Sequence, residues 1–196
     1  MKVLLINGSP RRNGNTDMML DALREHLENG GAVVERFQLG GEAIRGCAAC
    51  GECGRRLDRR CAIDEDLMND LIEKMIDSHA VVIGTPTYFG NVSTEVKALI
   101  DRAGLVGMVN RRMFRRKIGA AVVAVRRAGS VEAFHAVNNF FHLNQMIIPG
   151  SGYWTVGYGL RPGEVAGDSE GLSTLGALAA NILWLGAKIG EDGDKP

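Results

Sequence analysis

The stretch that decides the fold is KVLLINGSPRRNGNT, residues 2–16. Its short apolar run, residues 2–6, is typical of a buried strand. A loop rich in Gly, Asn and Arg follows, and Thr16 is suited to cap a helix that we expect to reach about residue 29. A strand, a glycine-rich loop and a helix in direct succession form the opening unit of an α/β protein.

The same alternation continues along the chain. Apolar runs predict further strands at residues 32–39, 80–84 and 118–125, and short ones around Pro149 at 146–148 and 153–159. Helical spacing of apolar residues predicts helices at 64–78, from 93 or 94 onward, at 131–145 and at 169–189. We therefore expect one domain over residues 1–196, a doubly wound five-stranded parallel sheet of order 2-1-3-4-5 with helices on both faces.

Composition narrows the range of partners. The chain has 196 residues, and its 23 Lys and Arg balance its 23 Asp and Glu, so no net field favours nucleic acid or a membrane surface. The apolar run at the N-terminus is too short for a signal peptide, and we expect no stretch that approaches the roughly 20 apolar residues of a membrane span. These features predict a cytoplasmic protein with neither a nucleic-acid nor a membrane partner.

The loop after the first strand has the chemistry of a phosphate site. In doubly wound sheets, ligands bind outside the carboxyl ends of the strands. Here hydroxyls, amides and a cation stand at a helix N-terminus, on Ser9, Arg11, Asn13, Asn15 and Thr16. The loop matches neither the Walker pattern nor the dinucleotide Gly-x-Gly-x-x-Gly. The alternative is a plain turn in which Thr16 only caps the helix.

The loop after the third strand, TPTYFGNVS at residues 85–93, carries two adjacent aromatic residues. Tyr88 and Phe89 form a candidate platform for a planar ring. The amide of Asn91 both donates and accepts hydrogen bonds, which suits the edge of a heteroaromatic ring. The alternative is a loop that packs its own aromatic side chains into the core.

Together, GSPRRNGNT (8–16), TPTYFGNVS (85–93) and RRAGS (126–130) resemble the NADPH-dependent FMN reductase branch of the flavodoxin-like superfamily. The resemblance covers nearly the full chain, and with the cysteines described below it points to the iron–sulfur flavoproteins. It implies an FMN-dependent oxidoreductase without a catalytic side chain, for which NAD(P)H is a possible co-substrate. The implied phosphate ligands are Ser9, Arg11, Asn15 and Thr16. The implied ring contacts are Pro86, Thr87, Tyr88, Phe89, Gly90 and Asn91, with a third loop of Arg126, Arg127, Ala128 and Gly129. Many relatives have glycines where this chain has Arg126 and Arg127.

All four cysteines lie in GCAACGECGRRLDRRC, residues 46–61. Disulfides are unusual in a cytoplasmic chain, and structural zinc usually takes two ligand pairs with a longer spacer. Three thiols separated by Ala and Gly can wrap one corner of a [4Fe–4S] cluster. We expect the ligands to be Cys47, Cys50, Cys53 and Cys61. A loop without a cluster stays open, since relatives without one keep some of these thiols.

Three functions compete. The first is an electron-transfer flavoprotein that holds FMN and a [4Fe–4S] cluster and exchanges electrons with a ferredoxin-like protein, NAD(P)H or a quinone. The second is a cluster-less NAD(P)H-dependent FMN or quinone reductase. The third is a zinc-stabilised interaction module on a flavodoxin scaffold.

The position of the cysteine loop, about residues 40–62, predicts its surroundings. It leaves the carboxyl end of the second strand, so we expect it on the same rim as the two flavin loops. Between Cys47 and Cys61 only Leu57 is large and apolar. Because the potential of a cluster is sensitive to solvent, we expect a second protomer to cover it, in a homodimer or homotetramer.

Overall fold

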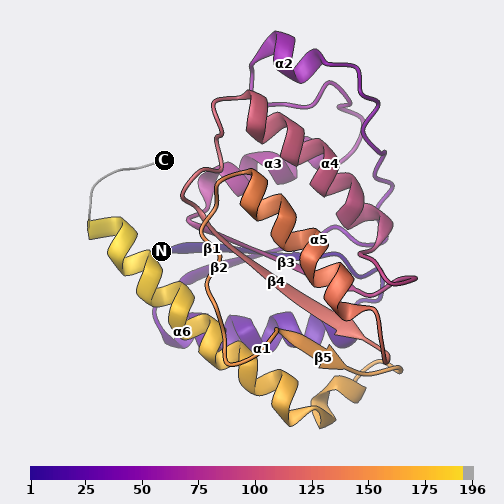
Figure 1. Cartoon of the computed structure of the whole chain (residues 1–196), viewed down its shortest axis with the longest axis vertical. Helices are drawn as coiled ribbons and strands as arrows, with labels where there is room; N and C mark the ends of the chain where they lie inside the picture. Colours follow the sequence, from indigo (N-terminus) through magenta and orange to yellow (C-terminus); the bar gives the residue numbers. More distant parts are fainter. Residues whose placement is uncertain (192–196) are drawn as a thin grey trace.

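The computed structural model describes residues 1–191. Its five strands are β1 (Lys2–Asn7), β2 (Val33–Gln38), β3 (Ala80–Pro86), β4 (Ile118–Val125) and β5 (Val156–Tyr158). They form one parallel sheet in the order β2-β1-β3-β4-β5 (Figure 1). The predicted fold class and strand order are confirmed.

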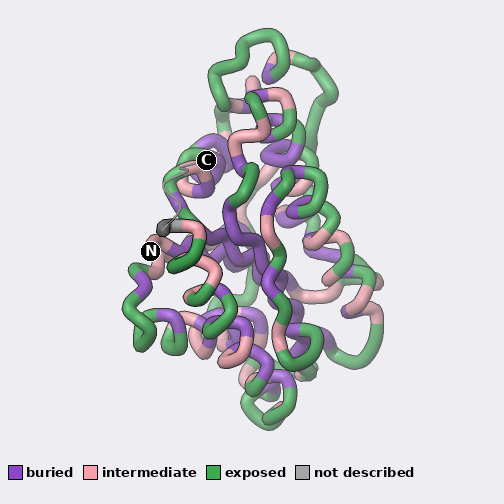
Figure 2. Tube along the Cα trace, turned by 60° about the vertical axis from the view of Figure 1, so that its left-hand side comes forward, coloured by how far each residue is buried: buried purple, intermediate pink, exposed green. Residues whose placement is uncertain are grey.

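Helices cover both faces of the sheet. Helices α1 (Asn15–Asn29) and α6 (Ser169–Glu191) lie on one face, and α3 (Met68–Asp77), α4 (Thr94–Val109) and α5 (Ser130–Leu143) on the other (Figure 1). Because successive strand residues point to opposite faces, Val3 packs with the first pair of helices and Leu4 with the other three. Figure 2 shows the resulting buried interior along the strands.

Several boundaries differ from the sequence-based expectation. Residues 146–148 make only one bridge, from Ile147 to Ile118, and β5 keeps three residues. The helix expected from residue 64 begins at Met68, because the Asp64 and Asp66 carboxylates accept bonds from the side chain of Asn69 and the backbone of Met68. Two short helices were not predicted, α2 (Glu52–Arg56) and the 3₁₀ turn η1 (Glu164–Gly167).

One helix corrects the expectation about membrane spans. Residues 169–189 of α6 are long and apolar enough, by length and composition alone, to cross a membrane. However, Leu175, Leu178 and Ile182 are buried in the core that α6 shares with α1. One face of α6 is therefore packed against the domain, and 28% of this apolar stretch is buried.

Candidate functional site

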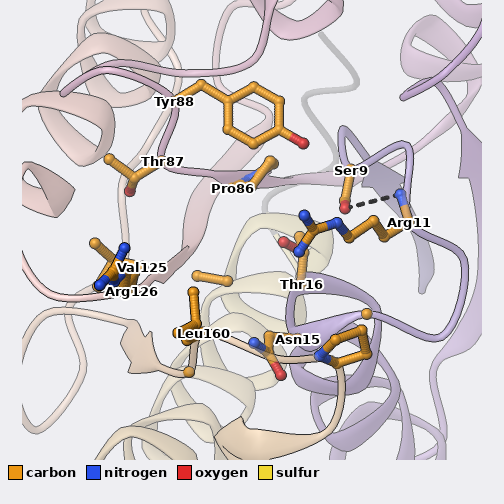
Figure 3. Close-up of a pocket in the computed structure, with 14 residues that line it drawn as sticks. Ser9, Arg11, Asn15, Thr16, Pro86, Thr87, Tyr88, Val125, Arg126 and Leu160 are labelled. Atoms are coloured by element: carbon orange, nitrogen blue, oxygen red, sulfur yellow. Dashed lines mark hydrogen bonds between the residues drawn. The ribbon is translucent and has the colours of Figure 1, made fainter.

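A cavity lies at the carboxyl ends of four strands (Figure 3). The register places Asn7 of β1 level with Gln38 of β2 and Gly84 of β3, so the loops that follow these strands begin at the same rim. The residues that line the cavity are Ser9, Arg11, Gly14, Asn15, Thr16, Pro86, Thr87, Tyr88, Ala124, Val125, Arg126, Gly159, Leu160 and Pro162. Its polar side comes from the loop after β1, and its less polar side from the other three loops.

The loop after β1 is held in shape by its own polar groups. The Asn7 side chain accepts a bond from the Ser9 backbone at 3.0 Å, and the Ser9 hydroxyl accepts one from the Arg11 backbone at 3.2 Å. Ser9 and Thr16 are both buried, so their hydroxyls face the cavity rather than bulk solvent. Helix α1 begins without a side-chain cap, which leaves its first N–H groups available for an anion.

Gly40 allows this loop to pack against the segment after β2. A Cβ at this position would stand 2.3 Å from the Ser9 carbonyl carbon and 2.5 Å from the Gly8 carbonyl oxygen. Because both are backbone atoms, no side-chain rotation could relieve the overlap. The sequence contains 26 glycines, and only the tertiary structure identifies this one as a support of the site.

The loop after β3 contributes less than expected. Pro86, Thr87 and Tyr88 line the cavity, and the Thr87 hydroxyl is buried without a hydrogen-bond partner in the described chain. Phe89 and Gly90 form a tight turn in which both have positive φ, 48° and 75°, and Tyr88 and Asn91 exchange two backbone bonds across it. Phe89 therefore projects fully into solvent, and Asn91 uses its side-chain oxygen on the Val92 backbone. Phe89, Gly90 and Asn91 do not line the cavity.

Other predicted residues also lie outside the cavity. Arg126 lines it, but Arg127, Ala128 and Gly129 do not. Gly129 instead packs against Gly90, where a Cβ would stand 2.8 Å from the Gly90 Cα atom. Asn13 lies on another side of the first loop, and its backbone donates to Asp17 at 2.8 Å.

Sequence reasoning missed the loop after β5. Gly159, Leu160 and Pro162 close the cavity there. The Asn15 carboxamide oxygen accepts a bond from the Val165 backbone at 3.2 Å, which ties this loop region to α1. The signal was present, because the strand expected at 153–159 ends at the same rim as every other parallel strand.

The four cysteine side chains line a second, small cavity. Cys53 and Cys61 are buried, whereas Cys47 and Cys50 are exposed. Burial raises the pKa of the Cys53 thiol. Across residues 1–191, no group of three or more His, Cys, Asp or Glu side chains is arranged to hold a metal ion. The four thiols thus share a cavity without forming a finished ligand sphere.

Two asparagines and one arginine fix the buried cysteines. The Asn69 side chain accepts a bond from the Cys61 backbone N–H at 2.8 Å and donates to the Cys61 carbonyl at 3.0 Å. Asn110 at the end of α4 donates to the Cys53 carbonyl at 3.4 Å. The Arg102 guanidinium of α4 donates from Nε to the Cys61 sulfur at 3.3 Å. Half of the cysteine set is therefore held in place by the fold.

The cysteine cavity does not lie on the flavin rim, which corrects the expected placement. Its wall includes Arg102 and Val106 of α4, and α2 packs beside the C-terminal part of that helix (Figure 1). The opposite end of α4 meets the rim, where the Ser93 hydroxyl donates to the Gly8 carbonyl at 2.8 Å. Residues 96 and 106 are about 15 Å apart along the helix at 1.5 Å per residue. The two cavities share no lining residue.

The rim cavity fits FMN on observations of this structure alone. Two buried hydroxyls and an uncapped helix N-terminus suit a phosphate, and Figure 3 shows the Arg11 side chain reaching into the same region. The unpartnered Thr87 hydroxyl suits the polar edge of the flavin ring. Fold and cavity together define a flavodoxin-like, FMN-binding protein.

Comparisons with known proteins also indicate a flavodoxin-like protein that binds FMN. The NADPH-dependent FMN reductase profile matches residues 1–160. An iron–sulfur flavoprotein of Methanocaldococcus jannaschii is 31% identical over 195 residues, which cover 94% of this chain and 98% of the relative. An iron–sulfur flavoprotein of Archaeoglobus fulgidus is 35% identical over 191 residues, 97% of this chain and 80% of the relative. The crystal structure of RosB with a bound intermediate, 8-demethyl-8-formylriboflavin-5'-phosphate, has a TM-score of 0.75 at 18% identity and covers 97% of this chain and 81% of RosB. The chain belongs to the NADPH-dependent FMN reductase family and is an FMN-dependent oxidoreductase.

Proposed function

We propose that this protein is an iron–sulfur flavoprotein that transfers electrons between FMN at the rim and a [4Fe–4S] cluster held by Cys47, Cys50, Cys53 and Cys61. The main support for this proposal is that the four cysteines line one cavity, in which hydrogen bonds fix the backbones of Cys53 and Cys61. The names of the relatives in Methanocaldococcus and Archaeoglobus support the same reading. When bound, FMN would supply two-electron chemistry and the cluster one-electron transfer, while the protein binds and orients both.

Each group has its own residues in this proposal. Ser9, Arg11, Asn15 and Thr16 bind the phosphate, whereas Pro86, Thr87, Tyr88 and Arg126 surround the ring. Ring contacts from Phe89, Gly90, Asn91, Arg127, Ala128 and Gly129, and a phosphate contact from Asn13, stay predictions. The Asn13 backbone donates to Asp17, and Gly129 packs against Gly90. We infer a reducing, cytoplasmic setting, which the four free thiols support. Electron donors and acceptors of this class include NAD(P)H, a quinone and a ferredoxin-like protein.

A second candidate is a cluster-less NAD(P)H-dependent FMN or quinone reductase. It is favoured by the incomplete arrangement of the thiols within residues 1–191 and by the description of the matched family. The visible spectrum of protein purified without oxygen separates the candidates. Flavin bands with a broad shoulder near roughly 400 nm, together with bound iron, support the cluster. Flavin bands without iron support the second candidate, and a colourless zinc protein would leave only the interaction module.

The phosphate placement can be tested by removing two hydroxyls. The double variant Ser9→Ala, Thr16→Ala loses two hydrogen bonds to a charged group, each of about 1.5–3 kcal/mol, so FMN should bind roughly 100-fold more weakly or worse. Fluorescence titration of flavin-free protein measures this affinity. The matched control removes two exposed hydroxyls, Thr94→Ala and Ser173→Ala, and should leave the affinity unchanged. Equal FMN affinity in the two double variants, at equal stability, would place the phosphate elsewhere.

We further propose a homodimer, or a homotetramer made of two dimers, in which a partner covers the cysteine loops. Cys47 and Cys50 are exposed, and the cysteine cavity lies against residues 102–106 of α4, away from the end of that helix that meets the rim. A second protomer could both shield the thiols and bring another flavin closer. Light scattering over a dilution series should show a dimer or tetramer. A monomer that retains both cofactors and exchanges electrons between them would rule this proposal out.

A further inference from the structure

A buried cation forms part of the wall of the cysteine cavity. The Arg102 side chain has no exposed surface, and its partner Asp66 is 4% exposed. Beyond its ion pair with Asp66, the guanidinium donates from Nη1 to the Arg45 carbonyl at 3.0 Å and from Nη2 to the Ile63 carbonyl at 2.8 Å. Its Nε–H donates to the Cys61 sulfur at 3.3 Å. Four of its five N–H donors thus meet the segment from Arg45 to Asp66, which carries Cys61.

Stability alone gives a weak reason for such an arrangement. Taking an ion pair out of water is costly, and well-packed apolar residues are often as stable as a buried pair. Carbonyl oxygens are also better acceptors than a neutral thiol, yet the Nε–H of Arg102 points to sulfur. A donor aimed at sulfur from inside the core is useful when that sulfur carries negative charge, as a metal-bound thiolate does.

We propose that Arg102 is a positioning residue for the cluster, which orients the Cys61 sulfur and stabilises the negative charge gained on reduction. This inference rests on the proposed function. Hydrogen bonds to cluster sulfurs and nearby positive charge both favour the reduced form, so they raise the reduction potential. Asp66 keeps the guanidinium in place and partly offsets its charge. The Nε–H group of Arg102 donates directly to the Cys61 sulfur, the proposed cluster ligand.

The surroundings allow this role. The Asn69 side chain bonds both the N–H and the carbonyl of Cys61, and these bonds fix the backbone of that residue. Because the backbone is fixed, the contact with Arg102 can orient the sulfur. Cys47 and Cys50 are exposed in a stretch without helix or strand, so they can adjust when iron binds. Cys53, Cys61 and Arg102 are therefore the part of the cysteine site that the fold holds in position.

The test compares two neutralised ion pairs, each of which has its cation on α4. Arg102→Met with Asp66→Asn removes the buried pair without changing the net charge. Lys97→Met with Asp101→Asn removes an exposed pair on α4, whose atoms lie 2.6 Å apart, and is the matched control. Arg102→Lys keeps the charge but loses the guanidinium fork. Iron and FMN content are measured in anaerobically reconstituted protein, and the cluster potential is measured by an electron paramagnetic resonance titration.

The neutralised buried pair should shift the cluster potential to a lower value. Arg102→Lys should shift it less, and the control pair should leave it at the wild-type value. If the buried-pair variant keeps FMN but loses iron, retention of iron by Arg102→Lys would support the proposal. An iron-loaded buried-pair variant with the wild-type potential would overturn it, as would iron loss from the Lys variant as well. Absence of iron from the wild-type protein would instead reject the proposed function, which distinguishes the two failures.

Discussion

Replacing Cys61 with alanine is expected to remove most of the bound iron while leaving FMN in place. A [4Fe–4S] cluster needs a ligand at each corner, and this chain has no fifth cysteine. The backbone at residue 61 should stay in position, because the Asn69 side chain bonds the N–H and the carbonyl of that residue, which alanine keeps. FMN should remain, since the two cavities have no lining residue in common. Iron and FMN per chain are measured in anaerobic preparations.

Leu57→Ala is a suitable control for this experiment. Leu57 lies in the same loop between the cysteines, but its side chain is 59% exposed and does not line the cysteine cavity. This variant should retain the wild-type iron content of about four per chain. Full iron occupancy in Cys61→Ala would remove Cys61 from the ligands and leave Cys47, Cys50 and Cys53 with an external fourth ligand.

Asp66→Asn is expected to reduce the free energy of unfolding by about 3–5 kcal/mol, because it leaves the buried Arg102 cation without its carboxylate. Urea unfolding at matched FMN occupancy measures the loss. The control Asp101→Asn breaks the exposed pair with Lys97 and should cost less than about 1 kcal/mol. Equal losses in the two variants would show that the buried pair does not stabilise the fold.

The same pair gives the stability a pH dependence of known sign. Burial raises the pKa of Asp66, but hydrogen bonds from Arg102 and from the Arg45 and Met68 backbones outweigh it and hold the pKa below its ordinary value. A carboxyl with a lowered pKa stabilises the fold above its unfolded pKa, near 4, and this contribution disappears as the pH falls through the folded value. The stability difference between wild type and Asp66→Asn should therefore be full at pH 7 and shrink below about pH 4. A difference that stayed constant into acid would contradict this assignment.

The local sequence pattern was sufficient to predict most of the fold and the position of the rim cavity, but not that of the cysteine cavity. Apolar runs and helical spacing predicted the strands of the sheet, and the alternation of strand and helix predicted the order 2-1-3-4-5. Because all strands are parallel, their carboxyl ends meet at one rim, and the loops after β1, β3 and β4 could be assigned to one cavity. Those predictions needed only interactions between near neighbours and a general rule of connection.

What only the tertiary structure decided depends on contacts between residues far apart in the chain. The cysteine loop leaves β2 at the rim, yet Asn110 and Arg102, 57 and 41 residues beyond Cys53 and Cys61, hold it at the other end of α4. Phe89 was expected at the ring, but the backbone pairing of Tyr88 with Asn91 directs it into solvent. Gly40 supports the phosphate loop only because the fold brings it so close to Ser9 that a Cβ would stand 2.3 Å from the Ser9 carbonyl carbon. The spacing of the cysteines shows that four thiols are present in one loop. Where that loop is held depends on α4, because Arg102 and Asn110 bond Cys61 and Cys53. The sequence alone does not reveal these distant contacts, and it therefore predicted the cysteines at the rim.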